Sequence, residues 1–319
     1  MYDVVAIGEL LIDFTVDRVQ ADGYPVVAAH PGGAPANFLA ALAKYGRRTA
    51  MVAKVGDDTF GRRLRETLEQ VGIDAQGVAV TGEAFTTLAF VTRDAAGERE
   101  FSFARKPGAD MLLRPEDLPL PLLAGTRALH FGTVCMTDEP ARSTHYRAVE
   151  YARAHGALIS FDPNLREPLW PRLEEAREQM LWGCAHADVV KISDSEVEFL
   201  WNCGPEAGAQ RLLEAFGARL VFVTLGKDGC CFANRNGVGR VPGLAGLDVV
   251  DTTGAGDIFG GTALWGLLES GKAPEDLTPA EMRAIAAMAC ATASLSTTKL
   301  GGIFSVPERE AAQRAAAQL

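Results

Sequence analysis

The chain has few of the side chains that bind metals or form disulfides, since its 319 residues include six cysteines and five histidines. The cysteines form no C-x-x-C pair, and they have no metal-ligand spacing with the histidines. This pattern argues against a zinc site and against a disulfide framework. It predicts reduced, mostly buried thiols and a cytoplasmic location.

Positive charge is also scarce, because 31 Lys and Arg residues stand against 41 Asp and Glu residues, for a formal net charge of −10. This balance argues against a nucleic-acid partner, although a local basic pocket for a phosphorylated ligand stays compatible with it. No uncharged apolar run reaches the roughly 18 residues of a membrane span, so no membrane partner is expected. Residues 1–8 lack the basic start of a signal peptide, and none is expected.

Two familiar nucleotide-binding motifs are absent. The chain contains no G-x-x-x-x-G-K-[ST], and Phe259 stands where a G-x-G-x-x-G motif beginning at Gly254 requires glycine. What the chain has instead is the segment Val250-Asp251-Thr252-Thr253-Gly254-Ala255-Gly256-Asp257, followed directly by an apolar run. The sequence therefore places a glycine-rich turn, ending in a carboxylate, at the start of a predicted helix.

That turn has two interpretations. Unpaired N–H groups and the helix dipole make such a turn a site for an anion, and Asp257 beside it is suited to take a proton from a hydroxyl that attacks a phosphate. In the alternative, Asp257 only caps the helix. The eight-residue context favours the first interpretation.

The order of expected elements predicts an α/β fold with a mostly parallel sheet covered by helices on both faces. Expected strands are 4–8, 49–55, 128–134, 158–162, 189–192 and 220–225, and expected helices are 35–45, 59–71, 141–154, 174–184, 195–201, 206–216 and 279–296. Segments 85–92 and 99–103 flank a turn at 94–97 and predict a hairpin. We expect one domain over residues 1–319, with a small β-sheet lid formed by about 14–30 and 85–105, and ligands at the carboxyl ends of the parallel strands.

Two segments together resemble the signatures of the ribokinase-like (PfkB-type) carbohydrate kinases: Gly32-Gly33-Ala34-Pro35-Ala36-Asn37 and the segment from Val250 to Asp257. The resemblance extends over nearly the whole chain. Its subgroup motifs are most similar to fructokinases, for example Gly8-Glu9-Leu10-Leu11-Ile12-Asp13-Phe14 and Asp162-Pro163-Asn164-Leu165-Arg166. The resemblance implies a ribokinase-like fold and an ATP-dependent sugar kinase.

The resemblance also implies a role for individual residues. Asp257 is the general base, and the N–H groups of Gly254, Ala255 and Gly256 form the anion hole. The implied sugar-binding residues are Asp13, Gly32, Gly33, Asn37, Phe103, Arg105 and Arg166. For several of these an ordinary structural role explains the residue as well: a cap for Asp13 and Asn37, a solvated surface position for Arg105, and a salt bridge for Arg166.

For the nucleotide, the resemblance implies ATP with Mg²⁺. The implied nucleotide-binding residues are Lys191, Ser193, Thr224, Gly226, Lys227, Gly229, Ala287, Cys290 and Ala291. Close helix packing explains the last three equally well. Glu196 is implied to support Mg²⁺ through water, although Ser193 stands where the family has asparagine, and Asp251 and Thr253 match positions near a potassium site.

The expected reaction is transfer of the γ-phosphate of ATP to a primary hydroxyl of a sugar, with fructose favoured. Ala104 stands where the subgroup often has tyrosine, so the identity of the sugar stays open, and 2-keto-3-deoxygluconate is the main alternative because Arg105 and Arg166 could bind its carboxylate. A non-catalytic sugar or nucleotide sensor of the same fold is a second alternative. Exposed strand edges in the lid predict a homodimer through the lid.

Overall fold

The computed structural model describes residues 1–93 and 99–319, so the turn expected at 94–97 lies outside the described residues. Within the described residues, ten strands form one large sheet, in the order β14-β13-β12-β11-β10-β9-β1-β4-β5 with β6 beside β4. Its strands are β1 (Tyr2–Ile7), β4 (Thr49–Gly56), β5 (Ile73–Asp74), β6 (Val78–Thr81), β9 (Thr126–Phe131), β10 (Leu158–Phe161), β11 (Val189–Ser193), β12 (Leu220–Thr224), β13 (Cys230–Asn234) and β14 (Gly237–Val241). Every pairing is parallel except those of β12 with β13 and of β13 with β14.

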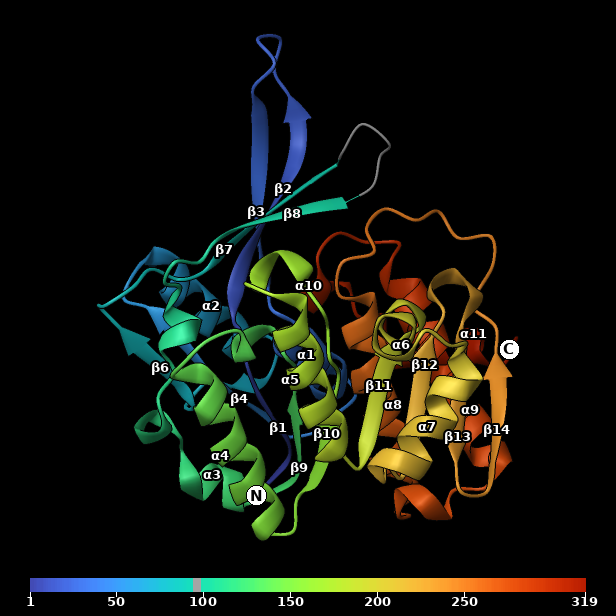
Figure 1. The fold of residues 1–319 in the computed structure, drawn as a ribbon. Coiled ribbons are helices and arrows are strands. Elements are labelled where there is room, and N and C mark those ends of the chain that lie inside the picture. The colour runs from blue at the N-terminus through green and yellow to red at the C-terminus, as the bar shows by residue number, and fades with distance from the viewer. Residues whose placement is uncertain (94–98) are drawn as a thin grey trace.

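Helices cover both faces of this sheet, as the alternating order of elements predicts (Figure 1). The α-helices are α1 (Ala34–Lys44), α2 (Thr59–Gln70), α3 (Leu120–Ala124), α4 (Ala141–Ala154), α5 (Leu173–Ala185), α6 (Asp194–Trp201), α7 (Pro205–Phe216), α8 (Ala255–Ser270), α9 (Pro279–Ser296), α10 (Gly302–Ser305) and α11 (Arg309–Ala316). Short 3₁₀ turns are η1 (Ala109–Leu112), η2 (Pro115–Asp117), η3 (Val134–Met136), η4 (Glu167–Leu169), η5 (Gly226–Asp228) and η6 (Pro274–Asp276). The three-layer α/β architecture is confirmed.

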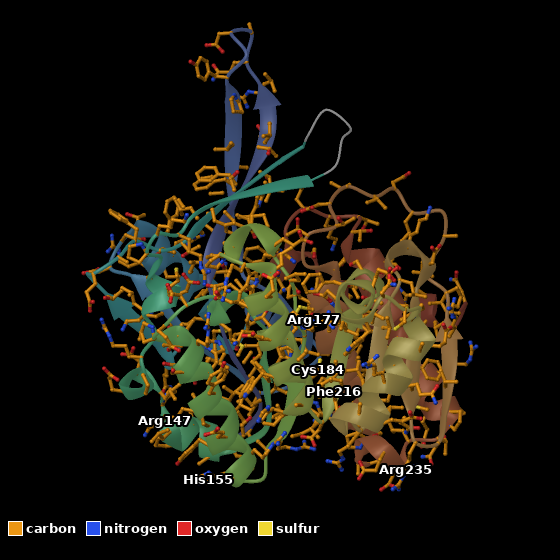
Figure 2. The ribbon with its side chains drawn as sticks, in the orientation of Figure 1. Arg147, His155, Arg177, Cys184, Phe216 and Arg235 are labelled. Atoms are coloured by element: carbon orange, nitrogen blue, oxygen red, sulfur yellow. The ribbon has the colours of Figure 1, made fainter. Side chains whose placement is uncertain are left out.

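Strand β1 shows why both faces need helices. Val4 and Ala6 pack into a core with α1, α2, α8, α9 and α11, whereas Val5 and Ile7 pack into a second core with α3 to α7. Successive side chains of a strand point to opposite faces, so a strand that is apolar at every position is stable only between two apolar layers. In Figure 2, Cys184 of α5 marks the second of these layers.

A second sheet of four strands stands at one end of the molecule, in the order β3-β2-β7-β8 (Figure 1). Its strands are β2 (Leu11–Val19), β3 (Pro25–Gly32), β7 (Leu88–Arg93) and β8 (Arg99–Ala104). It matches the expected β-lid, with β2 and β7 paired in parallel between two antiparallel partners. The outer part of the β2–β3 hairpin is exposed and extends away from the rest of the molecule.

Some boundaries differ from the sequence-based prediction. The strand expected at 128–134 ends at Phe131, because the chain then turns and Thr133 donates its N–H and its hydroxyl to the carbonyl of Pro163. Helix α9 begins where the Thr278–Glu281 capping box predicts, with Thr278 Oγ1 accepting from the N–H of Glu281, and it ends at Ser296 as expected. No helix in the described part of the chain is long and apolar enough to cross a membrane.

Candidate active site

Two neighbouring cavities open at the carboxyl ends of the parallel strands, on the side of the lid. The first has a volume of about 170 Å³ and lies beneath the lid; it is lined by Glu9, Leu11, Asp13, Gly33, Ala34, Asn37, Phe103, Val134, Asn164, Arg166, Lys191, Thr252, Thr253, Gly254, Gly256 and Asp257. The second has about 420 Å³ and is lined by Asn164, Leu165, Arg166, Glu167, Lys191, Ser193, Asp194, Ser195, Glu196, Phe199, Thr224, Gly226 and Gly256. Asn164, Arg166, Lys191 and Gly256 line both, so the two cavities meet at these residues.

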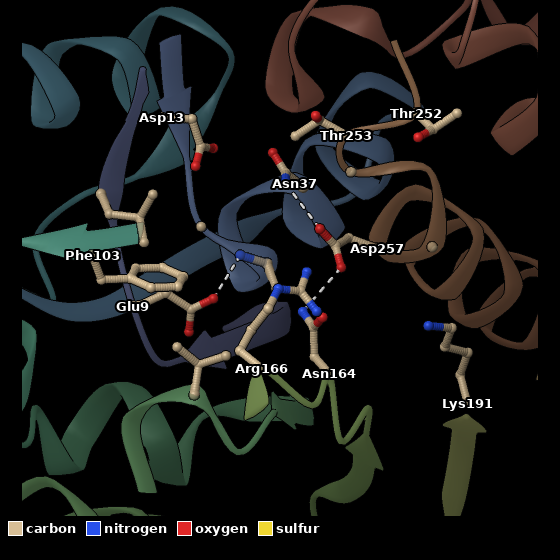
Figure 3. Close-up of a pocket in the computed structure, with 16 residues that line it drawn as sticks. Glu9, Asp13, Asn37, Phe103, Asn164, Arg166, Lys191, Thr252, Thr253 and Asp257 are labelled. Atoms are coloured by element: carbon tan, nitrogen blue, oxygen red, sulfur yellow. Dashed lines mark hydrogen bonds between the residues drawn. The ribbon is translucent and has the colours of Figure 1, made fainter. Parts of the chain in front are cut away.

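Asp257 lines the first cavity next to this junction, since it follows Gly256 in the first turn of α8 (Figure 3). Its Oδ2 accepts a hydrogen bond from Asn37 Nδ2 at 2.9 Å, and its Oδ1 accepts one from Asn164 Nδ2 at 3.4 Å. Burial raises the pKa of the Asp257 carboxyl, while the hydrogen bond from Asn37 and the charges of Lys191 and Arg166 oppose that rise. A carboxylate whose pKa is raised is a stronger proton acceptor, and two amides hold this one in a fixed orientation.

The amino end of α8 is shaped to receive an anion. Gly254 has φ 77°, and a Cβ at that position would lie 2.8 Å from the Cα of Gly302. No side chain caps the helix, and among the expected anion-hole groups the N–H of Ala255 donates to the carbonyl of Thr252 at 3.3 Å. Uncapped N–H groups of a first helical turn and the positive end of the helix dipole favour a negatively charged ligand.

Most of the expected sugar-binding residues meet around the first cavity. Asp13 lies on β2, Phe103 on β8 and Asn37 on α1, so the lid and the large sheet both contribute (Figure 3). Gly33 has φ 114°, and a Cβ there would lie 2.4 Å from the carbonyl oxygen of Glu9. Gly32 packs behind Asp13, since a Cβ at Gly32 would lie 2.1 Å from Asp13 Oδ2. Arg166 lines both cavities.

Arg105, unlike most of the expected sugar-binding residues, does not line this cavity. The residue follows β8, but its guanidinium is buried beneath the lid in an ion pair with Asp110. Its Nη1 donates to Thr137 Oγ1 at 3.1 Å, and its Nη2 donates to the carbonyl of Val134 at 2.9 Å. The expectation of a direct contact between Arg105 and the sugar is therefore corrected: the sequence gives no sign that a carboxylate five residues further on binds this guanidinium.

Several side chains at or next to the site had no role assigned from the sequence, among them Glu9, Asn164 and Asp162. Burial raises the pKa of Glu9 and that of Asp162 to about 7 in each case. Glu9 Oε1 accepts from the N–H of Ala34 at 2.8 Å, and Asp162 Oδ2 pairs with Lys191 Nζ at 2.9 Å. All three residues belong to motifs that resemble those of the family, so the motifs did include them. The motifs alone did not show which of their residues reach the site.

The second cavity gathers four of the expected nucleotide-binding residues: Lys191, Ser193, Thr224 and Gly226. Lys227 is exposed on η5, and Gly229 packs its backbone against Val241 behind that turn. Ala287, Cys290 and Ala291 of α9 are buried and line neither cavity. These three small residues are buried in the described structure, as the alternative of close helix packing expects, and their role in binding nucleotide stays a prediction.

The acidic residues expected near metal ions are held by hydrogen bonds. Glu196 Oε1 accepts from the N–H of Leu165 at 2.7 Å, and its Oε2 accepts from the N–H of Ser193 at 2.8 Å, so it forms a capping box on α6. Asp251 Oδ1 accepts from the N–H and the hydroxyl of Thr253, and its Oδ2 accepts from the N–H of Gly301. No group of three or more His, Cys, Asp or Glu residues in the described part of the chain could hold a metal ion by itself.

Asp162 Oδ1 provides a test of whether the site fits Mg²⁺. This oxygen is buried without a hydrogen-bond partner, and the pKa of the Asp162 carboxyl is raised by the neighbouring charge of Glu196 as well as by burial. Mg²⁺ keeps several waters and binds mainly to substrate phosphates in such sites. The residues therefore fit an ion that arrives with nucleotide phosphates and touches the protein through water.

These features are those of a phosphotransferase that acts on a hydroxyl group: a carboxylate held in a fixed orientation, an uncapped helix end beside it, and two cavities that meet next to it. The model of the pfkB family carbohydrate kinases matches residues 1–309. A probable fructokinase-3 of Arabidopsis thaliana is 43% identical over 307 residues, which cover 95% of this chain and 88% of that protein. The chain belongs to the pfkB family of carbohydrate kinases.

Solved structures agree with this assignment over the full length. A fructokinase of Xylella fastidiosa with bound ATP has a TM-score of 0.91 at 30% identity, covering 100% of this chain and 99% of that chain. A double mutant of fructokinase from Vibrio cholerae, with fructose, ADP and a potassium ion bound, has a TM-score of 0.87 at 31% identity and covers 99% of this chain and 98% of that chain. The ribokinase-like fold expected from the sequence is confirmed.

Proposed function

We propose that this kinase transfers the γ-phosphate of ATP to the primary hydroxyl of fructose, giving fructose 6-phosphate and ADP. The position of Asp257 in the first cavity, next to the residues that the two cavities share, supports this most directly, because a hydroxyl in the first cavity and a phosphate in the second would meet beside its carboxylate. The relatives support the choice of sugar, since one of them holds fructose and another is 43% identical to this chain and carries the name fructokinase.

In the proposed reaction the attacking hydroxyl gives its proton to Asp257 as its oxygen bonds to the γ-phosphorus. The bond from that phosphorus to the bridging oxygen breaks at the same time, and ADP leaves with the electron pair. Negative charge on the transferring group is stabilised by the first-turn N–H groups of Gly254, Ala255 and Gly256 and by the Lys191 ammonium. Lys191 can approach closely because Gly256 has no side chain: a Cβ there would lie 3.1 Å from Lys191 Nζ.

The sugar is proposed to bind in the first cavity. Asp13 and Asn37 would bind its hydroxyls, Gly32 and Gly33 would let the backbone approach it, and the Phe103 ring would cover one face. A carboxylate and an amide suit vicinal hydroxyls, because one accepts hydrogen bonds and the other both accepts and donates. Closure of this polar cavity by the lid would keep water from the phosphate and suppress hydrolysis of ATP.

The nucleotide is proposed to bind in the second cavity, against Ser193, Thr224 and Gly226, with the Gly229 turn supporting them. Lys227, exposed on η5, would meet the phosphates from the rim. Mg²⁺ would neutralise the phosphate oxygens, with Glu196 contacting its waters. Asp251 and Thr253 are proposed to lie beside an activating potassium ion, which is tested by replacing potassium with sodium at constant ionic strength and measuring turnover.

The test of the proposed function is release of ADP, coupled to a spectrophotometric readout, with ATP, Mg²⁺ and potassium present. Fructose, 2-keto-3-deoxygluconate, ribose and adenosine are supplied one at a time. Turnover with fructose and little with the other three supports the proposal. A clear preference for the keto acid would keep Asp257 as the base but replace the substrate, and no turnover with a wider set of sugars would favour a sensor.

Further proposals concern organisation. We propose a single kinase domain over residues 1–319, with the lid as part of it, located in the cytoplasm, where all six cysteines stay free as they are in the structure. A homodimer through the lid is supported by apolar side chains that the lid exposes to solvent: Val16, Val19, Tyr24 and Val27. Light scattering on the purified chain tests the dimer, and a monomer at micromolar concentration would contradict it.

A further inference from the structure

A buried ion pair between Arg105 and Asp110 lies directly behind the wall of the sugar cavity. The two side chains are 3% and 0% exposed, and Arg105 Nε donates to Asp110 Oδ2 at 2.8 Å. Thr87 Oγ1 donates to the other oxygen of Asp110, and Cys135 Sγ lies 3.4 Å from Asp110 Oδ2. A buried pair of this kind is stable only when the remaining donors and acceptors are also satisfied, and here they are.

The pair is close enough to the cavity to influence what binds there. Arg105 is two residues from Phe103, and its Nη2 donates to the carbonyl of Val134; both Phe103 and Val134 line the cavity. Arg105 and Asp110 also act electrostatically on Glu9 of the same wall, since the charge of Asp110 raises the pKa of Glu9 and the charge of Glu9 raises that of Arg105. Val134 therefore contacts the guanidinium and the cavity at once.

The charges on the cavity wall show what the Asp110 carboxylate prevents. Among the described residues that line the cavity, Glu9, Asp13 and Asp257 bear carboxyl groups, whereas the cationic side chains are Arg166 and Lys191. Lys191 is already paired with Asp162 at 2.9 Å. A guanidinium at position 105 without a counter-ion would add a positive charge behind this wall, and a substrate carboxylate would be attracted to it. The Asp110 carboxylate cancels that charge.

We propose that Asp110 is a specificity-determining residue, which holds and neutralises Arg105 so that the cavity selects a neutral sugar over a sugar acid. The inference rests on the proposed sugar kinase function and extends it to the discrimination between fructose and 2-keto-3-deoxygluconate. Asp110 acts through Arg105 and does not touch the sugar, so it is a positioning residue.

The test is the Asp110→Asn variant, which keeps the size of the side chain and an oxygen for Thr87 but leaves the Arg105 charge without its counter-ion. The measured quantity is kcat/KM for the keto acid divided by kcat/KM for the neutral sugar that the wild type prefers. We expect this ratio to rise about tenfold or more, because an unpaired charge in a low-dielectric wall acts across it with little screening. If both values fall together and the ratio stays constant, the role of Asp110 is only structural and the proposal is wrong.

A second variant keeps the proposal testable if the unpaired charge prevents folding. The double substitution Arg105→Gln with Asp110→Asn removes both charges and retains polar groups, and we expect its ratio to stay within about threefold of wild type. If this ratio rises in the double variant as well, charge neutralisation by Asp110 is not the cause of the preference for a neutral sugar. The substrate preference of the wild type distinguishes a failure of this inference from a failure of the proposed function. If it turns over a neutral sugar other than fructose, only the proposed substrate is wrong, and if it prefers the keto acid, both proposals are wrong.

Discussion

Replacing Asp257 with Asn is the most direct perturbation of the proposed chemistry. The two side chains have nearly the same shape, and the amide oxygen can keep the hydrogen bond from Asn37 Nδ2, which is 2.9 Å long in the native protein. Gly254 and Gly256 are unchanged, so the amino end of α8 still offers its N–H groups. The substitution therefore removes the ability to accept a proton and the negative charge while leaving the cavity intact.

The expected loss follows from the role of the base. A positioned general base contributes typically about 10²–10⁴ in rate, which is roughly 3–5 kcal/mol of barrier at about 1.4 kcal/mol per tenfold. The raised pKa of Asp257 makes it a stronger base than a solvated carboxylate, which places the expected effect in the upper part of this range. Substrate affinity has no comparable reason to fall, since loss of a carboxylate beside phosphate relieves repulsion. We expect kcat to fall about 10³-fold or more, with the dissociation constants of fructose and ATP within a few fold of wild type.

The assay is steady-state ADP release, with fructose and ATP binding measured separately by calorimetry. Asp13→Asn is the matched control, because Asp13 is a carboxylate of the same cavity with a proposed role in binding only. That control should mainly raise the KM for fructose. Turnover of Asp257→Asn within tenfold of wild type would refute the assignment of the base, and an equal loss of kcat in both variants would show that the cavity needs carboxylates in general.

Three further predictions concern the groups around the base. Glu9→Gln should raise the free energy of unfolding at pH 8 by up to roughly 3 kcal/mol, because burial raises the pKa of Glu9 from 4.5 to about 7. The folded state then binds more protons than the unfolded state between these values, so the wild type loses stability as the pH rises through them. Urea titrations from pH 4 to 8 should show that the difference in unfolding free energy between the variant and the wild type grows with pH. A constant difference would show that the titration of Glu9 is not its cause. Gly254→Ala should destabilise the chain by about 1–3 kcal/mol and also abolish most turnover. Gly271→Ala, at the other end of α8 with φ 65° and open space around it, should cost similar strain but keep full turnover, as thermal melts and kinetics can check. Lys191→Met should lower kcat about 10–10³-fold, whereas Lys227→Met should raise mainly the KM for ATP. If both variants change only the KM for ATP, Lys191 does not act on the transferring phosphate.

The fold could be predicted from the sequence because its signals are local. Capping residues and apolar periodicity lie within one element, so the Thr278–Glu281 box predicts the start of α9 without knowledge of the rest of the chain. The antiparallel strands β13 and β14 were missed. Glycines 237 and 239 weaken the strand pattern of β14, yet Gly239 pairs with Phe232 in the sheet, where a Cβ would lie 2.4 Å from the ring of Phe232. Tertiary packing then outweighs local preference.

Only the site residues that belong to a recognisable motif could be predicted from the sequence. Asp257, Asn37 and Asp13 belong to segments whose pattern resembles a family, and the structure brings them to one cavity. Arg105 also belongs to such a segment, yet its direction is decided by Asp110, Thr137 and the carbonyl of Val134. A guanidinium is bound by whichever acceptors surround it, and these acceptors lie up to 32 residues away in the sequence. Residue type and spacing predict that an arginine is present but not which partner neutralises it.

Asn37 shows why the geometry of the base needs the whole fold. Its Nδ2 bonds to Asp257, and its side chain lies between two glycines from distant segments: a Cβ at Gly254 would lie 3.0 Å from Asn37 Nδ2, and one at Gly302 would lie 2.2 Å from Asn37 Oδ1. Helix α1, the turn before α8 and helix α10 must therefore all be in place before the base is oriented. Because Asn37 also lines the sugar cavity, the same amide that orients the base is available to a sugar hydroxyl.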